Sequence, residues 1–584
     1  MLCWLHALPA GLEAIIGKSG IPRADISIYI KEAGHSNRVI ASLNAAKTRT
    51  PASVVKVFTL YASVLKLGFD YRFPTQFYMA GSLKNGILHG DLLVKGFGDP
   101  SLSEKDIPDI VRRIKAKGIG KITGNIVIDR TYFNVGTQNN SGFDKHTYSP
   151  YNAMPDAMMF NERVSTICVA PNKNDVHKKV SDGSYIVTNH LQRVNKPCRG
   201  RYSWPAVKID ESKALPEVVL KGKISKRCGN RNICKVITKP YKSFYYALKD
   251  ALSNEGIVVA GTMKLRKIPP HARILFTHYS KSLEKIVSKT AKKSNNLYAR
   301  HLLLFLGAKL YGAPATLSKG RKAVKQILRS DGVVMGSGNF RIDNGCGLSR
   351  SAKLNAKLLA KLYDHAYDRY GTRWMKTLSI AGVDGTIKRR FRGTVARNRA
   401  WMKTGTLKHV KNIGGYVKSR AGKVYTAVIL VNTRYGRWKA AKLQNDMIIW
   451  LVKYKGNGIK PAQKAVKPVK KEETVKKLSP TPTRRIKKEV IPQHKAPLSK
   501  IPKTYFIQAG SFSNMPGKSY FDDIEKLGMT YMVRHGEQYK VLIGAYATEE
   551  RAKKALKKVR RYINSGAFLV RDGNKKSDTT DILY

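Results

Sequence analysis

The run TPASVVKVFTLYASVLKLG occupies residues 50–68 and indicates more about the fold than any other stretch of the chain. Its apolar residues recur at helical spacing and Gly68 follows the last of them, which predicts a helix that ends at this glycine. Ser53 and Lys56 stand three residues apart in the first turn, so hydroxyl and amine share one helical face. A serine becomes a good nucleophile when a neighbouring base takes its proton, and a lysine of lowered pKa can be that base.

The S-x-x-K pattern carries little information when taken alone. It occurs again at Ser63–Lys66, inside the same apolar helix, and at Ser282–Lys285. We expect the hydroxyl of Ser63 to be out of reach of a substrate. On this pattern alone, a structural serine at a helix N-terminus followed by a solvated lysine is the favoured interpretation of Ser53.

Two companion motifs favour a catalytic interpretation. Ser294-Asn295-Asn296 fits S-x-N near a predicted helix start, and Lys403-Thr404-Gly405 lies in a predicted strand. S-x-N also occurs at Ser42–Asn44 and Ser337–Asn339, whereas K-T-G occurs once. The glycine leaves room for a substrate along the strand, and the lysine and threonine can receive a carboxylate. The three motifs in this order form the signature of penicillin-binding proteins and β-lactamases.

The spacing of the motifs separates these two classes. Ser294 lies 241 residues after Ser53, far more than a compact β-lactamase needs. Here the chain resembles the low-molecular-mass class C penicillin-binding proteins, which are serine D-Ala-D-Ala carboxypeptidases and endopeptidases with two domains inserted at this point. The resemblance covers roughly residues 8–455. It extends to GDLLVKGFGDP (90–100), GNIV (124–127), DNGCGLSR (343–350) and AGVDGT (381–386).

The resemblance implies a role for each motif residue. Ser53 attacks the carbonyl between two D-amino acids and forms an acyl-enzyme, Lys56 is the base, and Ser294 relays the proton to the leaving amine. Cys346 departs from the family pattern, in which we expect a serine, so a hydroxyl function at that position is doubtful. Neither a metal nor an organic cofactor is implied, and β-lactam antibiotics are implied as covalent inhibitors.

The remaining motif residues are implied to bind the substrate. Asn296 holds a substrate amide, Lys403 and Thr404 bind the terminal carboxylate, and Gly405 belongs to the same strand. The backbone N–H groups of Ser53 and Thr406 form the oxyanion hole. The implied substrates are the stem peptides of peptidoglycan.

The predicted fold class is α+β, with a penicillin-binding or β-lactamase-like catalytic domain in which helices flank an antiparallel sheet. DISIYIKEAG and VIASLN predict a hairpin, and AWMKTGTL, NIGGYVKSR and KVYTAVILVN predict three consecutive antiparallel strands. The predicted domains are a catalytic domain (11–70 and 283–455), a first insert (71–160 and 248–282), a second nested insert (161–247), a linker (456–502) and a C-terminal domain (503–571). The linker holds seven prolines and no aromatic residue, a composition typical of a flexible chain that spans on the order of 40 Å.

Residues 503–571 predict a small domain with the order βαββαβ. YFIQAGSF (505–512) and YKVLIGAY (539–546) resemble the SPOR domain, which binds glycan strands stripped of their peptides. The resemblance implies sugar contacts from Gln508, Ser511 and Tyr539, although aromatic residues on such strands can equally be core. An RNA-binding domain has the same element order, but the RNP1 pattern is absent, so we expect no nucleic acid partner.

The charge of the chain limits its partners without choosing among them. It has 108 Lys and Arg against 39 Asp and Glu, a net charge of +69, which attracts anionic polymers whatever the fold. A non-catalytic polymer-binding protein therefore stays a rival interpretation, as does a β-lactamase of the same fold. No apolar run reaches the 18 or so residues of a transmembrane span. We interpret MLCWLHALPA as the end of a signal peptide and expect a periplasmic, exported protein.

Six cysteines bear on the compartment. Cys228 and Cys234 stand six positions apart around a Gly-Asn turn signal. Neither a C-x2-C pair nor clustered histidines accompany them, which argues against a zinc site. We predict a Cys228–Cys234 disulfide in an oxidising compartment, with two free thiols as the alternative.

Overall fold

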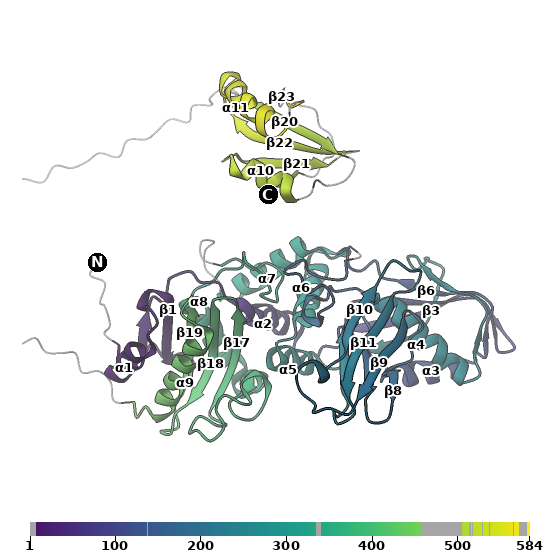
Figure 1. Ribbon diagram of the computed structural model, residues 1–584, viewed down its shortest axis with the longest axis horizontal. Helices are drawn as coiled ribbons and strands as arrows, with labels where there is room; N and C mark the ends of the chain where they lie inside the picture. Colours follow the sequence, from purple (N-terminus) through teal and green to yellow (C-terminus); the bar gives the residue numbers. More distant parts are fainter. Residues whose placement is uncertain are drawn as a thin grey trace, which may run out of the picture. The chain divides into compact units, whose positions relative to one another are not determined.

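The computed structural model describes residues 8–136, 138–333 and 340–456 of the first part of the chain. Further along it describes residues 505–512, 516, 518–527, 529–535, 538–564, 566–571 and 581–583. The chain forms two compact units, Met1–Lys464 and Ala465–Tyr584, which are described separately (Figure 1). The first seven residues of the predicted signal segment, and the predicted linker beyond residue 456, lie outside the described residues.

The first unit contains a six-stranded sheet built from both ends of the catalytic segment. Its order is β16-β17-β18-β19-β1-β2, and all neighbouring strands are antiparallel. The predicted hairpin and the three predicted consecutive strands are thereby confirmed. The strands are β1 (Ile26–Glu32), β2 (Val39–Leu43), β16 (Ser379–Ile380), β17 (Ala400–Leu407), β18 (Val410–Lys418) and β19 (Val424–Asn432).

Helices cover both faces of this sheet because its strands are apolar on both sides. On one face, α1 (Ala10–Ser19) and α9 (Arg437–Lys453) form a core with Ile28, Ile413 and Ile429. On the other face the sheet packs, through Tyr416, Val428 and Leu430, against a helical layer. That layer consists of α2 (Lys56–Leu67), α5 (Leu283–Lys293), α6 (Asn296–Tyr311), α7 (Leu317–Ser330) and α8 (Ala356–Met375).

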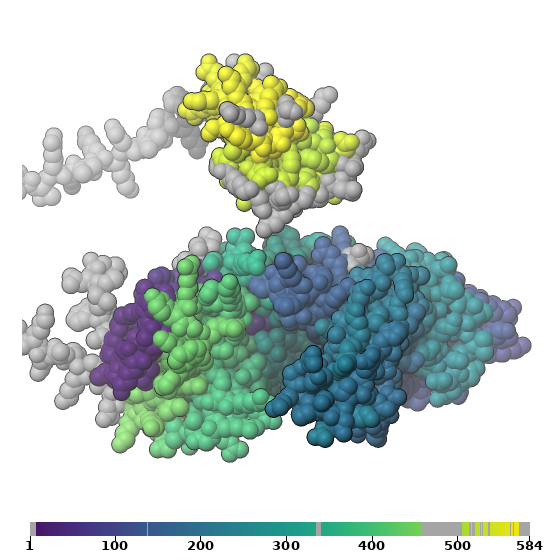
Figure 2. Space-filling view, in the orientation of Figure 1, coloured from purple at the N-terminus to yellow at the C-terminus, as the bar shows by residue number. Residues whose placement is uncertain are grey.

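The chain between α2 and α5 forms three further sheets. A seven-stranded sheet packs against α3 (Ile107–Lys115) and α4 (Pro240–Asn254), and two three-stranded sheets share a smaller core around Ile167, Val218 and Ile233. In the space-filling view, the blue surface around β9–β11 and the green surface around β17–β19 are both visible on one face of the first unit (Figure 2). Helix α4 runs across the boundary that we predicted at 247/248, and the boundaries of the two inserts stay predictions.

The seven-stranded sheet consists of β3 (Pro74–Lys84), β4 (Ile87–Gly96), β5 (Lys121–Ile122), β6 (Ile126–Asp129), β13 (Val258–Val259), β14 (Met263–Leu265) and β15 (Arg273–Tyr279). The smaller sheets have the orders β10-β11-β9 and β12-β7-β8. Their strands are β7 (Ser165–Ala170), β8 (Asp175–Lys178), β9 (Ile186–Val194), β10 (Ala206–Asp210), β11 (Glu217–Ser225) and β12 (Arg231–Lys235).

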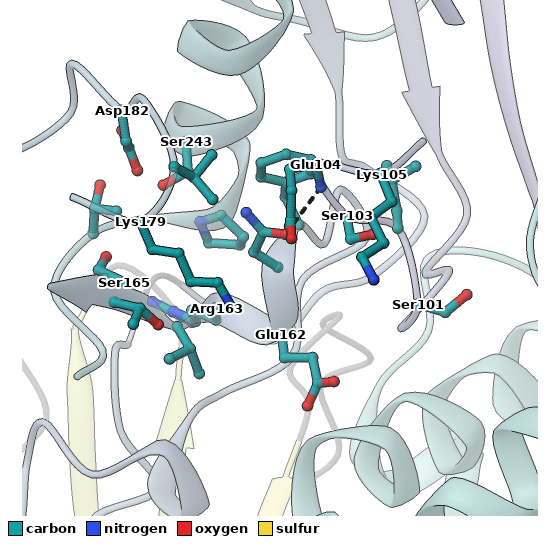
Figure 3. Close-up of a pocket in the computed structure, with 18 of the residues that line it drawn as sticks. Ser101, Ser103, Glu104, Lys105, Glu162, Arg163, Ser165, Lys179, Asp182 and Ser243 are labelled. Carbon is teal, nitrogen blue, oxygen red and sulfur yellow. Dashed lines mark hydrogen bonds between the residues drawn. The ribbon is translucent and has the colours of Figure 1, made fainter. Parts of the chain in front are cut away.

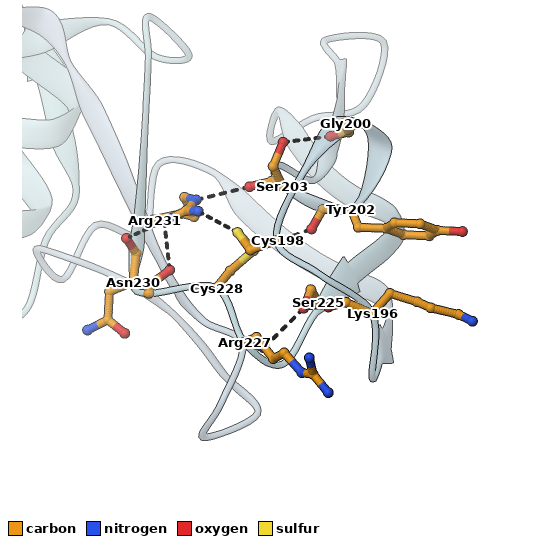
Figure 4. The surroundings of a disulfide bond; sticks show 11 residues. Lys196, Cys198, Gly200, Tyr202, Ser203, Ser225, Arg227, Cys228, Asn230 and Arg231 are labelled. Carbon is orange, nitrogen blue, oxygen red and sulfur yellow. Dashed lines mark hydrogen bonds between the residues drawn. A yellow bond between two sulfur atoms is a disulfide. The ribbon is translucent and has the colours of Figure 1, made fainter.

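A disulfide joins Cys198 to Cys228, so the predicted Cys228–Cys234 pair is wrong (Figure 4). Cys228 is buried in the turn after β11, close to the loop that follows β9. Cys234 lies on β12, where its backbone is paired with Thr166 of β7 and its side chain is exposed. The spacing of the cysteines in the sequence does not reveal that a strand, β12, begins at Arg231 and places Cys234 in a sheet.

The C-terminal unit has the predicted βαββαβ order. The elements are β20 (Tyr505–Phe512), α10 (Lys518–Lys526), β21 (Tyr531–His535), β22 (Tyr539–Tyr546), α11 (Glu549–Tyr562) and β23 (Phe568–Arg571). A further short strand, β24 (Asp581–Leu583), extends the antiparallel sheet to the order β23-β20-β22-β21-β24. The core joins Ile507, Val533 and Val541 of the sheet to Ile524 of α10 and Val559 of α11.

Among the helices in the described ranges, none is both long and apolar enough to cross a bilayer.

The position of the disulfide generates a first prediction. Replacing both cysteines, as in Cys198→Ser/Cys228→Ser, should lower the free energy of opening around β11 by about 3–4 kcal/mol, because the bond closes a loop with a sequence separation of 30 residues. Native-state hydrogen exchange of the β11 amides measures this quantity. The matched control Cys234→Ser removes an exposed thiol and should change it by less than about 0.5 kcal/mol. Equal effects of the two changes, or a non-reduced peptide containing a Cys228–Cys234 bridge, would contradict the assignment.

Candidate active site

Ser53 lies in a short 3-10 turn, η2 (Ala52–Val55), that leads directly into α2. The turn is held against the sheet, because Asn412 of β18 donates its side-chain amide to the carbonyl oxygens of Thr50 (2.9 Å) and Pro51 (3.0 Å). The predicted helix therefore exists, and its first turn is a tighter one that leaves Ser53 partly exposed at the wall of a cavity.

The three sequence motifs meet around this serine. Lys56 Nζ lies 2.8 Å from Ser53 Oγ and donates a hydrogen bond to Asn296 Oδ1 at 2.7 Å. Lys403 Nζ donates to Ser294 Oγ at 2.9 Å and to the Thr404 carbonyl oxygen at 2.7 Å. Two lysine–serine pairs therefore face the same site from α2, β17 and the corner between α5 and α6.

Both lysine side chains are completely buried, and this controls their protonation. Burial, aided by the charge of Arg300, lowers the pKa of Lys56 to about 8. Burial also lowers the pKa of Lys403 well below its usual value, and the nearby Lys56 lowers it further. Lys56 can therefore lose its proton close to neutral pH.

Gly405 brings β17 into direct contact with the turn that carries Ser53. A Cβ atom at this position would lie 2.7 Å from the Pro51 carbonyl oxygen and 3.0 Å from the amide nitrogens of Ser53 and Val54. A larger residue at position 405 would therefore collide with the backbone of the turn that carries Ser53. The adjacent Thr404 Oγ1 lies 2.8 Å from Thr386 Oγ1, within the segment 381–386 noted in the sequence.

A cavity of about 1130 Å³ opens beside the serine. Ser53, Ser294, Asn296 and Thr406 line it. It is also lined by Phe143, Asp144 and Tyr151 from the segment between β6 and β7, and by Arg350, Lys408, Arg434 and Arg437. Cations outnumber acids on this wall, so the site favours an anionic ligand.

Sequence reasoning missed the contribution of Tyr151. Its carbonyl oxygen accepts a hydrogen bond from Asn296 Nδ2 at 2.9 Å, which fixes the orientation of the amide that also contacts Lys56. A backbone acceptor from a distant segment leaves no signal in residue types, so no motif could have found it.

Cys346 contributes through its backbone as well. Its carbonyl oxygen accepts a hydrogen bond from Lys56 Nζ, while its thiol points to Asn344 Oδ1 at 3.1 Å. The side chain that departs from the family pattern is therefore turned toward Asn344.

The other matches to the motifs lie outside this cluster. Ser63 is buried within α2 and donates to the Thr59 carbonyl oxygen at 2.9 Å. Ser282 directly precedes α5, and Ser42–Asn44 lies at the end of β2. Ser337–Asn339 falls outside the described residues.

In the C-terminal unit, the predicted sugar contacts lie on two adjacent strands. Gln508 alternates along β20 with Ile507 and Ala509, which face the helices, so its side chain belongs to the opposite face of the sheet. Ser511 is exposed and donates to Gln538 Oε1 at 2.7 Å, and Tyr539 of β22 is paired in register with Phe512.

The chain is similar to a known enzyme family over its first part and to a known domain family over its second. The family model "D-Ala-D-Ala carboxypeptidase 3 (S13) family" matches residues 8–454, and the SPOR domain model matches residues 501–571. The D-alanyl-D-alanine carboxypeptidase DacB of Haemophilus influenzae is 28% identical over 423 residues, which cover 69% of this chain and 85% of the relative. A D-alanyl-D-alanine carboxypeptidase of an Actinomadura species is 24% identical over 469 residues, covering 78% and 86%.

The fold of the first unit also has a solved counterpart. The crystal structure of penicillin binding protein 4 from Haemophilus influenzae superposes with a TM-score of 0.64 and 24% identity, covering 76% of this chain and 99% of that one. A second structure of that protein, in complex with a β-lactam, gives a TM-score of 0.61. At this level of identity the likeness shows the fold.

The lowered pKa of Lys56 generates a second prediction. We expect a β-lactam to modify Ser53 at a rate that rises with pH, with a midpoint near 8, because an ammonium at Lys56 cannot accept the serine proton and a neutral amine can. Stopped-flow measurement between pH 6 and 10 tests this dependence. Lys56→Arg keeps the charge but supplies no neutral amine in this range, so its rate should be lower by a factor of about 10²–10⁴. A rate independent of pH, or a fast Lys56→Arg variant, would show that the base is another group.

Proposed function

The chain belongs to the D-Ala-D-Ala carboxypeptidase 3 (S13) family and is a serine-type carboxypeptidase, and we propose that Ser53 is the nucleophile of its reaction. The observation that carries this proposal is the contact between Ser53 Oγ and the buried amine of Lys56 at 2.8 Å. Among the three S-x-x-K serines, Ser53 is the one that lines the large cavity.

In the proposed reaction, neutral Lys56 takes the hydroxyl proton while Ser53 Oγ attacks the carbonyl carbon of the penultimate D-alanine. The C–N bond breaks, the terminal D-alanine leaves as an amine, and Ser53 carries the acyl group as an ester. The proton returns to the leaving nitrogen through Ser294, whose hydroxyl lies 2.9 Å from Lys403 Nζ. Water then hydrolyses the ester and restores Ser53.

The proposed substrate contacts follow from the arrangement of β17. On one edge, β17 pairs briefly with β16 at Trp401 and Met402. Further along that edge, residues Thr404–Thr406 lie along the turn that carries Ser53. We assign the terminal carboxylate to Lys403 and Thr404, and the oxyanion to the backbone N–H groups of Ser53 and Thr406. A bound carboxylate would raise the lowered pKa of Lys403, so substrate itself would favour the cationic form that binds it.

We extend the proposal to cleavage of peptide cross-links, which is the endopeptidase reaction. The same acyl transfer applies, and a cavity of about 1130 Å³ exceeds the size common for sites of small ligands. The rival β-lactamase interpretation is less favoured, because the S13 family model matches the whole of residues 8–454, inserts included.

The SPOR domain supports a second part of the proposal, in which peptide-free glycan holds the enzyme near its peptides. Gln508, Ser511 and Tyr539 are the proposed sugar contacts, and linkage of the two units would raise the local concentration of substrate. We further propose a periplasmic location. The Cys198–Cys228 disulfide supports this, because such bonds persist in oxidising compartments.

A third prediction tests the nucleophile. Ser53→Ala should abolish both covalent labelling by a fluorescent penicillin and release of D-alanine, because no other hydroxyl contacts Lys56 among the described residues. Ser63→Ala and Ser282→Ala are matched controls and should label like the unmodified protein. Labelling of the Ser53→Ala variant at the original rate would refute the proposed function.

A fourth prediction tests the glycan contact. In a Ser53→Ala background, which prevents cleavage, the full chain should bind peptide-free glycan at moderate salt, whereas binding to RNA should fall steeply as salt screens the +69 charge. Gln508→Ala should weaken glycan binding about tenfold in a sedimentation assay, with an unchanged melting temperature. Lys554→Ala on α11 is a charge-removing control that should leave glycan binding unchanged. Retention of RNA with loss of glycan would favour the nucleic acid interpretation of this domain.

A further inference from the structure

Three successive residues before β7 adopt the left-handed backbone conformation. Asn161, Glu162 and Arg163 have φ values of 47°, 54° and 57°. Side chains disfavour this region, and such outliers persist where the surrounding structure fixes them, often at functional sites. The turn therefore calls for a physical reason.

The turn is anchored from both sides. Asn161 Oδ1 accepts a hydrogen bond from the Glu104 amide at 3.0 Å. Arg163 is buried and donates to the Met154 carbonyl oxygen at 2.9 Å and to Asn139 Oδ1. Figure 3 shows the side chains of Glu162 and Arg163 leaving this turn in different directions. The anchors of the two flanking residues leave Glu162 to point elsewhere.

Glu162 reaches the corner between α5 and α6. Its Oε2 accepts a hydrogen bond from Asn295 Nδ2 at 2.7 Å, and its Oε1 forms an ion pair with Lys289. Tyr298, which is buried, directs its hydroxyl to Glu162 Oε1 at 3.4 Å and accepts a bond from Lys289 Nζ at 3.1 Å. One carboxylate thus binds residues on both sides of Ser294.

The corner that Glu162 binds is itself held in an unfavourable conformation. Ser294 ends α5 with a φ of 55°, which is again left-handed. Asn295 follows as the N-cap of α6, and its Oδ1 accepts from the Tyr298 amide at 3.1 Å. Both ends of the Asn295 amide are therefore engaged, one by its own helix and the other by Glu162. Relaxation of Ser294 would have to break one of these bonds.

We propose that Glu162 is a positioning residue for the carboxypeptidase reaction: through Asn295 it keeps Ser294 Oγ within hydrogen-bond distance of Lys403. This inference rests on the proposed function, in which Ser294 passes a proton to the leaving amine. A displacement of about 1 Å in a reacting group can cost a hundredfold in rate. The strained turn is then explained, because it aims a carboxylate at a catalytic corner from a distant part of the chain.

The test compares turnover of a D-Ala-D-Ala peptide in variants along this contact. Glu162→Ala should lower kcat by about 10- to 100-fold with KM changed less than threefold, because the substrate contacts are intact. Glu162→Gln keeps an oxygen for Asn295 Nδ2 and should recover most of the rate. Asn295→Ser keeps a helix cap but removes the donor to Glu162, and should lose as much as Glu162→Ala.

The double variant Glu162→Ala/Asn295→Ser should lose no more than either single variant, since both remove one contact. Glu104→Ala is the matched control: Glu104 and Glu162 both line a second cavity, of about 400 Å³ (Figure 3), and the described residues show no contact of the Glu104 side chain with the corner. Its kcat should be unchanged. Melting temperatures measured on all variants separate positioning from stability.

Two outcomes would overturn the proposal. One is a Glu162→Ala variant with unchanged kcat and a lowered melting temperature, and the other is additive losses in the double variant. If Glu162→Ala fails to fold, the kcat and melting temperature of Asn295→Ser and Glu162→Gln are compared in the same way. Residual turnover in Ser53→Ala would instead refute the proposed function, so the two failures can be told apart.

Discussion

The active region depends on the burial of two lysine amines, Lys56 and Lys403, behind one serine. Burying a charged amine is unfavourable unless it is hydrogen-bonded or gives up its proton. Both responses are present, since each amine has hydrogen-bond acceptors and each has a lowered pKa. Removing either lysine from its acceptors would leave a buried polar amine without hydrogen bonds, so the surrounding elements must stay fixed relative to one another.

The rest of the first unit supplies that rigidity from segments far apart in sequence. The serine turn is held by Asn412 of β18, the edge of β17 is brought against it at Gly405, and Asn296 is oriented by the Tyr151 carbonyl. Apolar cores on both faces of the six-stranded sheet hold these elements in place. The chain between α2 and α5 therefore contributes contacts to the site, because the Tyr151 carbonyl and the Glu162 carboxylate both belong to it.

Features of the fold and the site that depend on side-chain type could be predicted from the sequence, whereas contacts made by backbone atoms could not. That Ser53, Lys56, Ser294, Asn296 and Lys403 come together could be predicted, because the chemistry proposed for them demands specific side chains at specific spacings. The antiparallel strands and the βαββαβ order followed from alternation of apolar residues. Contacts made by backbone carbonyls, such as those of Tyr151 and Cys346, leave no trace in residue type. The disulfide was mispredicted because proximity in sequence does not show that Cys234 belongs to a strand, and Glu162 follows no motif at all.

The hydrogen-bond acceptors around Lys56 are all uncharged. Its partners are a hydroxyl, an amide oxygen and a carbonyl oxygen, and within the described part of the chain no carboxylate forms an ion pair with it. A carboxylate at that distance would stabilise the ammonium and raise its pKa, which would leave no neutral amine near pH 7. Uncharged acceptors satisfy the buried amine without adding a negative charge that would raise its pKa in this way. Glu162 is instead paired with Lys289 and Asn295 at the corner between α5 and α6, while the hydrogen-bond acceptors of Lys56 are uncharged oxygen atoms.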